Sequence, residues 1–99
     1  MLKKFESYQL ALELYHGCEG LKLPSHLRDQ LLRASLSIVL NLAEGSGKPT
    51  LKDKRRFYAI ALGSCRETQA LLHVTRNEIL FSLADRVGGC LYRLVHPRP

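Results

Sequence analysis

The chain has 99 residues, of which 45% are hydrophobic and 24% are charged, a composition typical of a single folded domain over residues 1–99. Its formal net charge of +6 favours anionic partners such as nucleic acid. The 3 cysteines are widely spaced, which excludes a disulfide scaffold and a zinc knuckle. No apolar run approaches the roughly 18–20 residues of a membrane span and no signal region is visible, so we expect a soluble, cytoplasmic protein.

The first half of the chain predicts two helices. Between residues 4 and about 19, apolar side chains recur every three or four positions, the period of an amphipathic helix. After a connection that ends in proline, Ser25 is expected to be the N-cap of a second helix that runs to about Glu44. We expect Gly45 or Gly47 to supply the left-handed residue that closes this helix.

The second half of the chain predicts two more helices. Thr50 is expected to cap the third helix, with Asp53 returning a bond to the cap. This helix should reach about Asn77, with Phe57 on its core-facing stripe. We expect the last turn within residues 77–82, and then a shorter fourth helix that is weakened by a Gly-Gly pair. The pattern therefore predicts an all-α protein, an antiparallel up-down-up-down four-helix bundle.

The second helix is apolar on most sides but carries one narrow polar seam. Its polar residues recur at steps of four, four and three, which stack on one helix face. We expect a buried hydrogen-bonded network that fixes the helix register, with an Arg33–Glu67 pair, because a buried charge needs a partner. The predicted network consists of Arg33, Ser37, Asn41, Glu44, Ser64 and Glu67. The surplus apolar face of this helix predicts a homo-oligomer, since it would otherwise remain exposed.

A basic run begins where the seam ends. It occupies a loop and a helix start, where backbone N–H groups and the helix dipole also favour anions. Five cations, with Asp53 as the one acid among them, are candidates for phosphate contacts: Lys48, Lys52, Lys54, Arg55 and Arg56. Arg66 is a sixth candidate, and stacking on bases would rest on Tyr58. The alternative for this run is a solvated surface without a ligand.

Nothing in the sequence predicts a reaction, a cofactor or a metal. The stretch from Gly45 to Thr50 lacks the first glycine of a phosphate-binding loop, and Pro49 stands where that loop needs Ser or Thr. Ser37 has no histidine one turn away that could act as its base. The histidines have no partners at metal-ligand spacing. We therefore expect no catalytic residue and no enzyme activity.

Two motifs carry a family resemblance. They are Arg-Ala-x-x-Ser-Ile-x-x-Asn-x-Ala-Glu-Gly over residues 33–45 and Phe-x-x-x-Ala-x-Gly-Ser-x-x-Glu over residues 57–67. With them the chain resembles, from near Phe5 over nearly its whole length, the four-helix-bundle proteins encoded in intervening sequences of bacterial 23S ribosomal RNA genes. The resemblance implies a homopentameric ring. It also implies kinship with the accessory variability protein of diversity-generating retroelements, a basic barrel that binds reverse transcriptase and nucleic acid.

Two hypotheses follow from the sequence. The first is a non-enzymatic, oligomeric, basic bundle that binds structured RNA or a ribonucleoprotein through phosphate contacts, with little sequence preference. The second is a protein-interaction adaptor, for example for a reverse transcriptase or another mobile-element enzyme, in which the basic surface meets an acidic protein patch.

Overall fold

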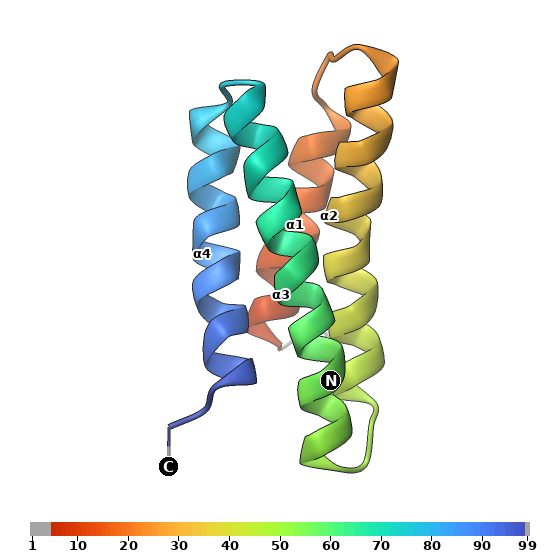
Figure 1. Ribbon diagram of the computed structural model, residues 1–99, viewed down its shortest axis with the longest axis vertical. Coiled ribbons are helices and arrows are strands. Elements are labelled where there is room, and N and C mark those ends of the chain that lie inside the picture. Colours follow the sequence, from red (N-terminus) through yellow and green to blue (C-terminus); the bar gives the residue numbers. More distant parts are fainter. Residues whose placement is uncertain (1–4, 99) are drawn as a thin grey trace.

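The computed structural model describes residues 5–98, and these residues form four α-helices and no strand. The helices are α1 (Glu6–Glu19), α2 (Ser25–Ser46), α3 (Leu51–Val74) and α4 (Glu78–Val95). They lie side by side along the long axis of a body of 41 × 21 × 21 Å, and short connections join successive helices at alternate ends (Figure 1). The first and last helices, α1 and α4, contact each other. Helix α2 packs against α1 and α3, and α3 packs against α2 and α4.

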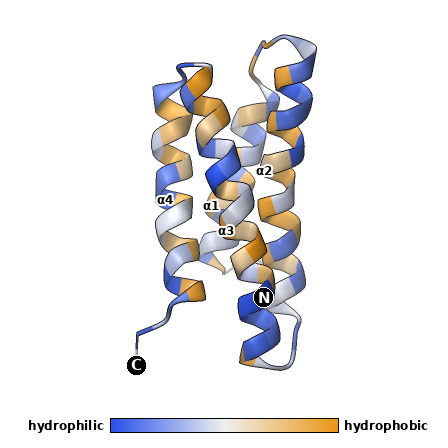
Figure 2. Ribbon diagram, viewed as in Figure 1, coloured by the Kyte–Doolittle hydropathy of each residue, from blue (hydrophilic) through white to orange (hydrophobic). Residues whose placement is uncertain are grey.

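A single hydrophobic core runs between the helices. Each helix contributes side chains spaced by three, four or seven residues, so one stripe of each helix faces inward. Burying one such side chain stabilises the fold by roughly 1.5–3 kcal/mol. Outside this core, the first turns of α3 are mostly hydrophilic (Figure 2). The larger fully buried side chains are Leu14 and Cys18 of α1, Leu31, Ile38 and Leu42 of α2, Cys65 and Leu72 of α3, and Val87 and Leu91 of α4.

The ends of α2 differ from the expectation. Pro24 is the N-cap and Ser25 already belongs to the helix, with no side-chain cap hydrogen bond. The helix continues through Gly45 to Ser46, and Gly47 has a φ of −88°, so neither glycine adopts a left-handed conformation. The prediction of a left-handed closing glycine is wrong, because the last turn tightens in the right-handed sense: the Gly47 N–H donates to the Glu44 carbonyl at 3.2 Å.

The turn between α3 and α4 lies earlier in the chain than expected, since α3 ends at Val74 and α4 begins at Glu78. Asn77 caps α4 by accepting a hydrogen bond from the Leu80 N–H at 2.9 Å, so α4 begins at Glu78. The prediction that the turn lies within residues 77–82 is wrong, because α4 already begins at Glu78. With 18 residues α4 is shorter than α2 and α3, as expected, but longer than α1, which has 14. In the turn itself, Arg76 has a φ of 61°, the left-handed region that non-glycine residues rarely adopt.

A close contact between α3 and α4 explains one glycine of the Gly-Gly pair. A Cβ atom on Gly88 would lie 3.6 Å from the Cys65 Sγ and 3.2 Å from the Arg66 Nη1, so α4 approaches α3 closely here. The Cys65 thiol donates to the Ala84 carbonyl at 3.3 Å. Burial raises the pKa of Cys65 to about 11, which keeps this thiol protonated and able to donate.

Candidate nucleic-acid interface

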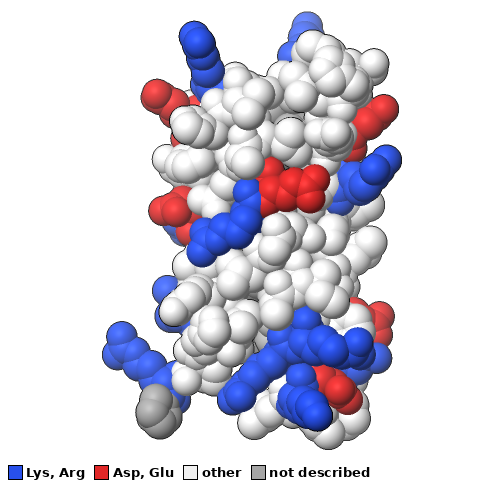
Figure 3. Space-filling view, viewed as in Figure 1, with Lys and Arg blue, Asp and Glu red and all other residues white. Residues whose placement is uncertain are grey.

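Lys and Arg side chains gather at the end of the bundle that carries the α2–α3 turn, and this end is called the basic end below (Figure 3). The turn and the first turns of α3 hold all five cations of the predicted run. Thr50 fixes this local structure, because its Oγ1 accepts a hydrogen bond from the Asp53 N–H at 3.2 Å, as predicted. The side chains of the run divide into two groups with different surroundings.

Two lysines of the run are held by contacts within the protein. The Lys54 Nζ donates to the Ser46 carbonyl at 2.8 Å and so satisfies a backbone acceptor at the end of α2. The Lys48 Nζ lies 2.9 Å from the Glu44 Oε2 and 5.0 Å from the centre of the Phe57 ring. Both lysines are only partly exposed, so they stabilise the turn as well as adding charge to it.

The other three cations, Lys52, Arg55 and Arg56, are exposed. Lys52 and Arg56 are four residues apart on α3, so they lie one above the other on the helix surface. The Arg56 guanidinium lies 4.7 Å from the centre of the Phe57 ring, a cation–π contact that leaves its N–H groups available. None of the three forms an ion pair with another residue in the described range 5–98. They are the groups best placed to meet phosphates.

Tyr58 does not lie where the sequence suggested. Tyr58 is only 7% exposed and belongs to the core, so the prediction that it could stack on bases is wrong. The reason lies on α2: a Cβ atom on Gly45 would lie 2.8 Å from the Tyr58 Cε1, so only glycine leaves room for this ring. Burial raises the pKa of Tyr58. Phe57, expected in the core, is the partly exposed aromatic residue of the pair.

Arg66 stands apart from the basic end. It is ten residues beyond Arg56 on α3, a rise of roughly 15 Å. Its Nη1 donates to the Gln69 Oε1 at 2.9 Å, and the Gln69 Nε2 donates to the Asp85 Oδ1 on α4 at 3.3 Å. The structure therefore places Arg66 in a polar link between α3 and α4 and does not bring it together with the five-cation run.

The centre of the predicted polar seam is present between α2 and α3. The hydroxyl oxygens of Ser37 and Ser64 are 2.7 Å apart, and either group can be the donor. The Asn41 Nδ2 donates to the Ser37 carbonyl at 2.8 Å and to the Ser37 Oγ at 3.1 Å. These contacts tie one turn of α2 to one turn of α3 and so support the expected register of the two helices.

The charged members of the seam behave differently. Arg33 and Glu67 are both exposed, and no ion pair joins them among the residues described. Glu44 is exposed too and pairs with Lys48 at the basic end. The prediction of a buried Arg33–Glu67 pair is wrong for the single chain, because both side chains lie on the outer side of their helices. Even a formed ion pair between exposed side chains contributes only about 0–1 kcal/mol. Arg33→Ala or Glu67→Ala should therefore change the stability of the single chain little.

Exposed apolar side chains lie on the outer sides of α2 and α3. Leu36 and Leu40 are one turn apart on α2, and Leu40 is 57% exposed. Ile60 is likewise exposed on α3. The surplus apolar surface predicted for α2 is therefore present on the single chain.

Two further findings bear on the class of protein. No helix within residues 5–98 is both long and apolar enough to cross a membrane. In the same part of the chain, no three His, Cys, Asp or Glu side chains come together as they would around a metal ion.

The fold and its surface define a small four-helix protein with one basic end. Comparison with protein families matches residues 4–85 to the family described as 23S rRNA-intervening sequence protein, and the chain belongs to this family. The resemblance noted in the sequence is thereby confirmed. Comparisons with curated proteins and with solved structures return no match.

Proposed function

We propose that this protein is a non-enzymatic basic bundle that associates with structured RNA or a ribonucleoprotein through phosphate contacts. The observation that carries the proposal is the exposed group of Lys52, Arg55 and Arg56 at the start of α3, which no acidic partner neutralises among residues 5–98. Forked guanidinium groups and flexible ammonium groups suit phosphate oxygens. The family description, which refers to 23S rRNA intervening sequences, supports RNA as the anion.

The proposal includes self-association of the antiparallel bundle into a ring, a pentamer by the family resemblance. The apolar face of Leu36, Leu40 and Ile60 supports this part, because an exposed apolar surface in a soluble assembly favours burial against another copy. In a ring the basic end would repeat around the axis, and its field would sum. Weak single phosphate contacts would then act together.

A salt titration of RNA binding tests the phosphate contacts. The variant carries Gln at Lys52, Arg55 and Arg56, since Gln keeps the helix propensity of these positions. We expect weaker binding and a slope of log affinity against log salt that shrinks by about 2–3, because each lost phosphate contact removes about 0.7–0.9 from the slope.

The matched control carries Gln at three exposed cations away from the basic end, Lys22, Arg76 and Arg86. It has the same net charge as the first variant, so it shows how much of the effect comes from the lower net charge and how much from where the cations lie. Equal slopes for the two variants would overturn the assignment to the basic end.

The solution mass tests the assembly in the same preparations. Leu40→Glu should lower the mass to that of a single chain. The control is Ile79→Glu, which changes an 84% exposed residue at the opposite end and should leave the mass unchanged. A single-chain mass for the unmodified protein would refute the ring and leave the phosphate contacts to be judged by their own titration.

A further inference from the structure

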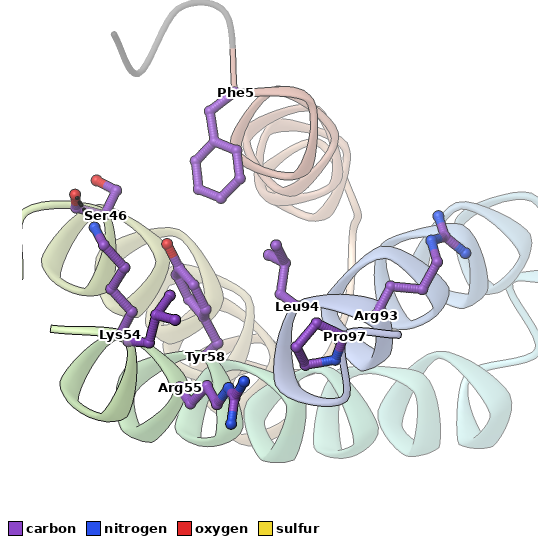
Figure 4. A pocket seen from close by; sticks show the side chains of 9 residues that line it. Phe5, Ser46, Lys54, Arg55, Tyr58, Arg93, Leu94 and Pro97 are labelled. Atoms are coloured by element: carbon purple, nitrogen blue, oxygen red, sulfur yellow. Dashed lines mark hydrogen bonds between the residues drawn. The ribbon is translucent and has the colours of Figure 1, made fainter. Parts of the chain in front are cut away.

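A cleft opens into the basic end of the bundle (Figure 4). Its volume is about 440 Å³, within the range of roughly 300–1,000 Å³ that is usual for ligand pockets. Residues from both ends of the described chain and from the α2–α3 region line it, so the cleft exists only in the folded bundle.

The interior of the cleft is apolar. The side chains of Phe5, Tyr58 and Leu94 point toward one another from three different elements (Figure 4). The ring centres of Phe5 and Tyr58 are 6.2 Å apart and the rings are tilted by 55°, so the two rings pack together at the cleft. Leu51 and Pro97 continue the apolar wall to the surface, and Leu51 is 69% exposed at the first position of α3.

The rim of the cleft is positive. Lys54, Arg55 and Arg93 are lining residues, and no carboxylate side chain is among them. Lys54 is turned toward Ser46, whereas Arg55 and Arg93 extend away from the apolar interior (Figure 4). A ligand that fits must therefore place hydrocarbon inside and negative charge just outside.

An apolar interior with a cationic rim distinguishes between two kinds of anionic ligand, a nucleic acid and an acidic peptide. A nucleobase carries hydrogen-bonding groups on its edges, and the lining of the cleft offers them few partners. The Ser46 hydroxyl and the Lys54 ammonium already donate to carbonyl oxygens within the protein. A phenylalanine or leucine side chain has no such groups and gains from burial against the same lining. Aspartate or glutamate residues beside it would meet the cationic rim.

We propose that the cleft docks an acidic peptide segment of a partner protein, with one aromatic or branched aliphatic side chain inserted as an anchor. The site is distinct from the phosphate contacts proposed above, although Arg55 borders both. It is the kind of site that an adaptor protein needs, since the anchor supplies affinity and the rim selects acidic sequences.

The test measures fluorescence anisotropy of a short labelled peptide that has Asp and Glu residues around one Phe, titrated with the full chain. We expect saturable binding that weakens by about tenfold or more when the Phe is replaced by Ser, because the anchor no longer buries apolar surface. Equal binding of the Phe and Ser peptides would overturn the proposal, since attraction by charge alone would then explain it. Failure of both peptides to bind would also overturn the proposal.

Two protein variants locate the binding. Leu51→Glu places a carboxylate at the mouth of the cleft, where an acid is compatible with a helix N-terminus, so the fold should persist. Ile79→Glu makes the same change in the first turn of α4, at the opposite end. We expect Leu51→Glu to weaken the Phe peptide by about tenfold, and Ile79→Glu to leave its affinity nearly unchanged. Equal effects of the two variants would overturn the assignment to the cleft.

A competition experiment separates this proposal from RNA binding. An unlabelled trinucleotide and an abasic trinucleotide of the same charge are added to the bound Phe peptide. We expect the two to compete equally and weakly, through the rim alone. Displacement by the trinucleotide but not by the abasic one would assign the interior to a nucleobase and refute the peptide anchor.

Discussion

At the basic end Thr50 caps α3, and at the opposite end Asn77 caps α4, in each case by accepting a hydrogen bond from the backbone N–H three residues further on. Each end also has a cation that reaches back to the preceding helix. The Lys54 Nζ is 2.8 Å from the Ser46 carbonyl oxygen at the basic end. The Arg28 Nη2 is 3.5 Å from the Glu19 carbonyl oxygen at the opposite end.

The two ends differ in how their remaining charges are placed. At the opposite end acids and bases alternate: Asp29 follows Arg28, Glu78 follows Arg76, and His16 lies 2.7 Å from Glu19. At the basic end exposed cations dominate, and an apolar cleft opens among them. The same kinds of capping contact close helices at both ends. The unbalanced charge is thus not needed to close a helix, and it remains available for a ligand.

The largest expected difference between the ends concerns two glycines that lie in helix contacts. A methyl group on Gly45 would lie 2.8 Å from the ring of the buried Tyr58 and 3.1 Å from the Phe57 Cβ. A methyl group on Gly17 would lie 2.6 Å from the Leu80 Cδ2, which is the tip of a flexible side chain. We expect Gly45→Ala to destabilise the fold by about 1–2 kcal/mol, because overpacking exceeds the gain in helix propensity.

For Gly17→Ala we expect a change near zero, because Leu80 can move and alanine favours the helix by about 1 kcal/mol. Urea denaturation of the two variants beside the unmodified protein measures both effects. If Gly45→Ala proved as stable as Gly17→Ala, the contact between Gly45 and Tyr58 would not be as tight as described.

A smaller difference is expected for the two caps. Asn77 is partly buried and accepts at 2.9 Å, whereas Thr50 is exposed and accepts at 3.2 Å. Replacing either by Ala should destabilise the fold by about 1 kcal/mol, with Asn77→Ala at the upper side of the usual range of about 0.5–2 kcal/mol. Thermal denaturation compares them, with Ser82→Ala as an exposed control within α4. A larger loss for Thr50→Ala would reverse this ranking of the ends.

The smallest effect is expected for Lys54 and Arg28, the two cations that donate to a carbonyl of the preceding helix. Lys54→Met keeps the aliphatic stem and removes the ammonium, which should destabilise the fold by about 0.5–1 kcal/mol through the unsatisfied Ser46 carbonyl. Arg28→Met should change stability by less than about 0.5 kcal/mol, since its contact is long and exposed. High salt is the right condition, because it screens the repulsion that Lys54→Met also relieves. Equal changes would mean that the Lys54 contact contributes no more than the Arg28 contact.

Local signals in the sequence were sufficient for much of the fold. The helical period predicts all four helices, and the Thr50 cap depends only on residues three apart, so both could be predicted. The pairing of Ser37 with Ser64 follows from small and polar side chains on α3 that match the polar seam of α2. The Asn77 cap of α4 likewise depends only on residues three apart, but it was not predicted from the sequence.

The rotation of α3 could not be predicted from periodicity. Phe57 and Tyr58 are adjacent aromatic residues, so either fits an apolar stripe, and only the space left by Gly45 decides between them. In the candidate site, the prediction that the five cations occupy a turn and the start of a helix is confirmed. The contacts of Lys48 with Glu44 and of Lys54 with Ser46 depend on how the turn folds back, which spacing does not reveal.

The Phe57 ring has one more consequence. Two cations, the Lys48 ammonium and the Arg56 guanidinium, rest within 5.0 Å of its centre, which restricts the rotamers of two long side chains before any ligand arrives. A side chain that is already restricted loses less conformational entropy when it binds, and for a long cation the full loss is about 1.5–2 kcal/mol. An anion that binds beside Phe57 should therefore show a smaller entropic penalty in calorimetry than the number of its cationic contacts implies.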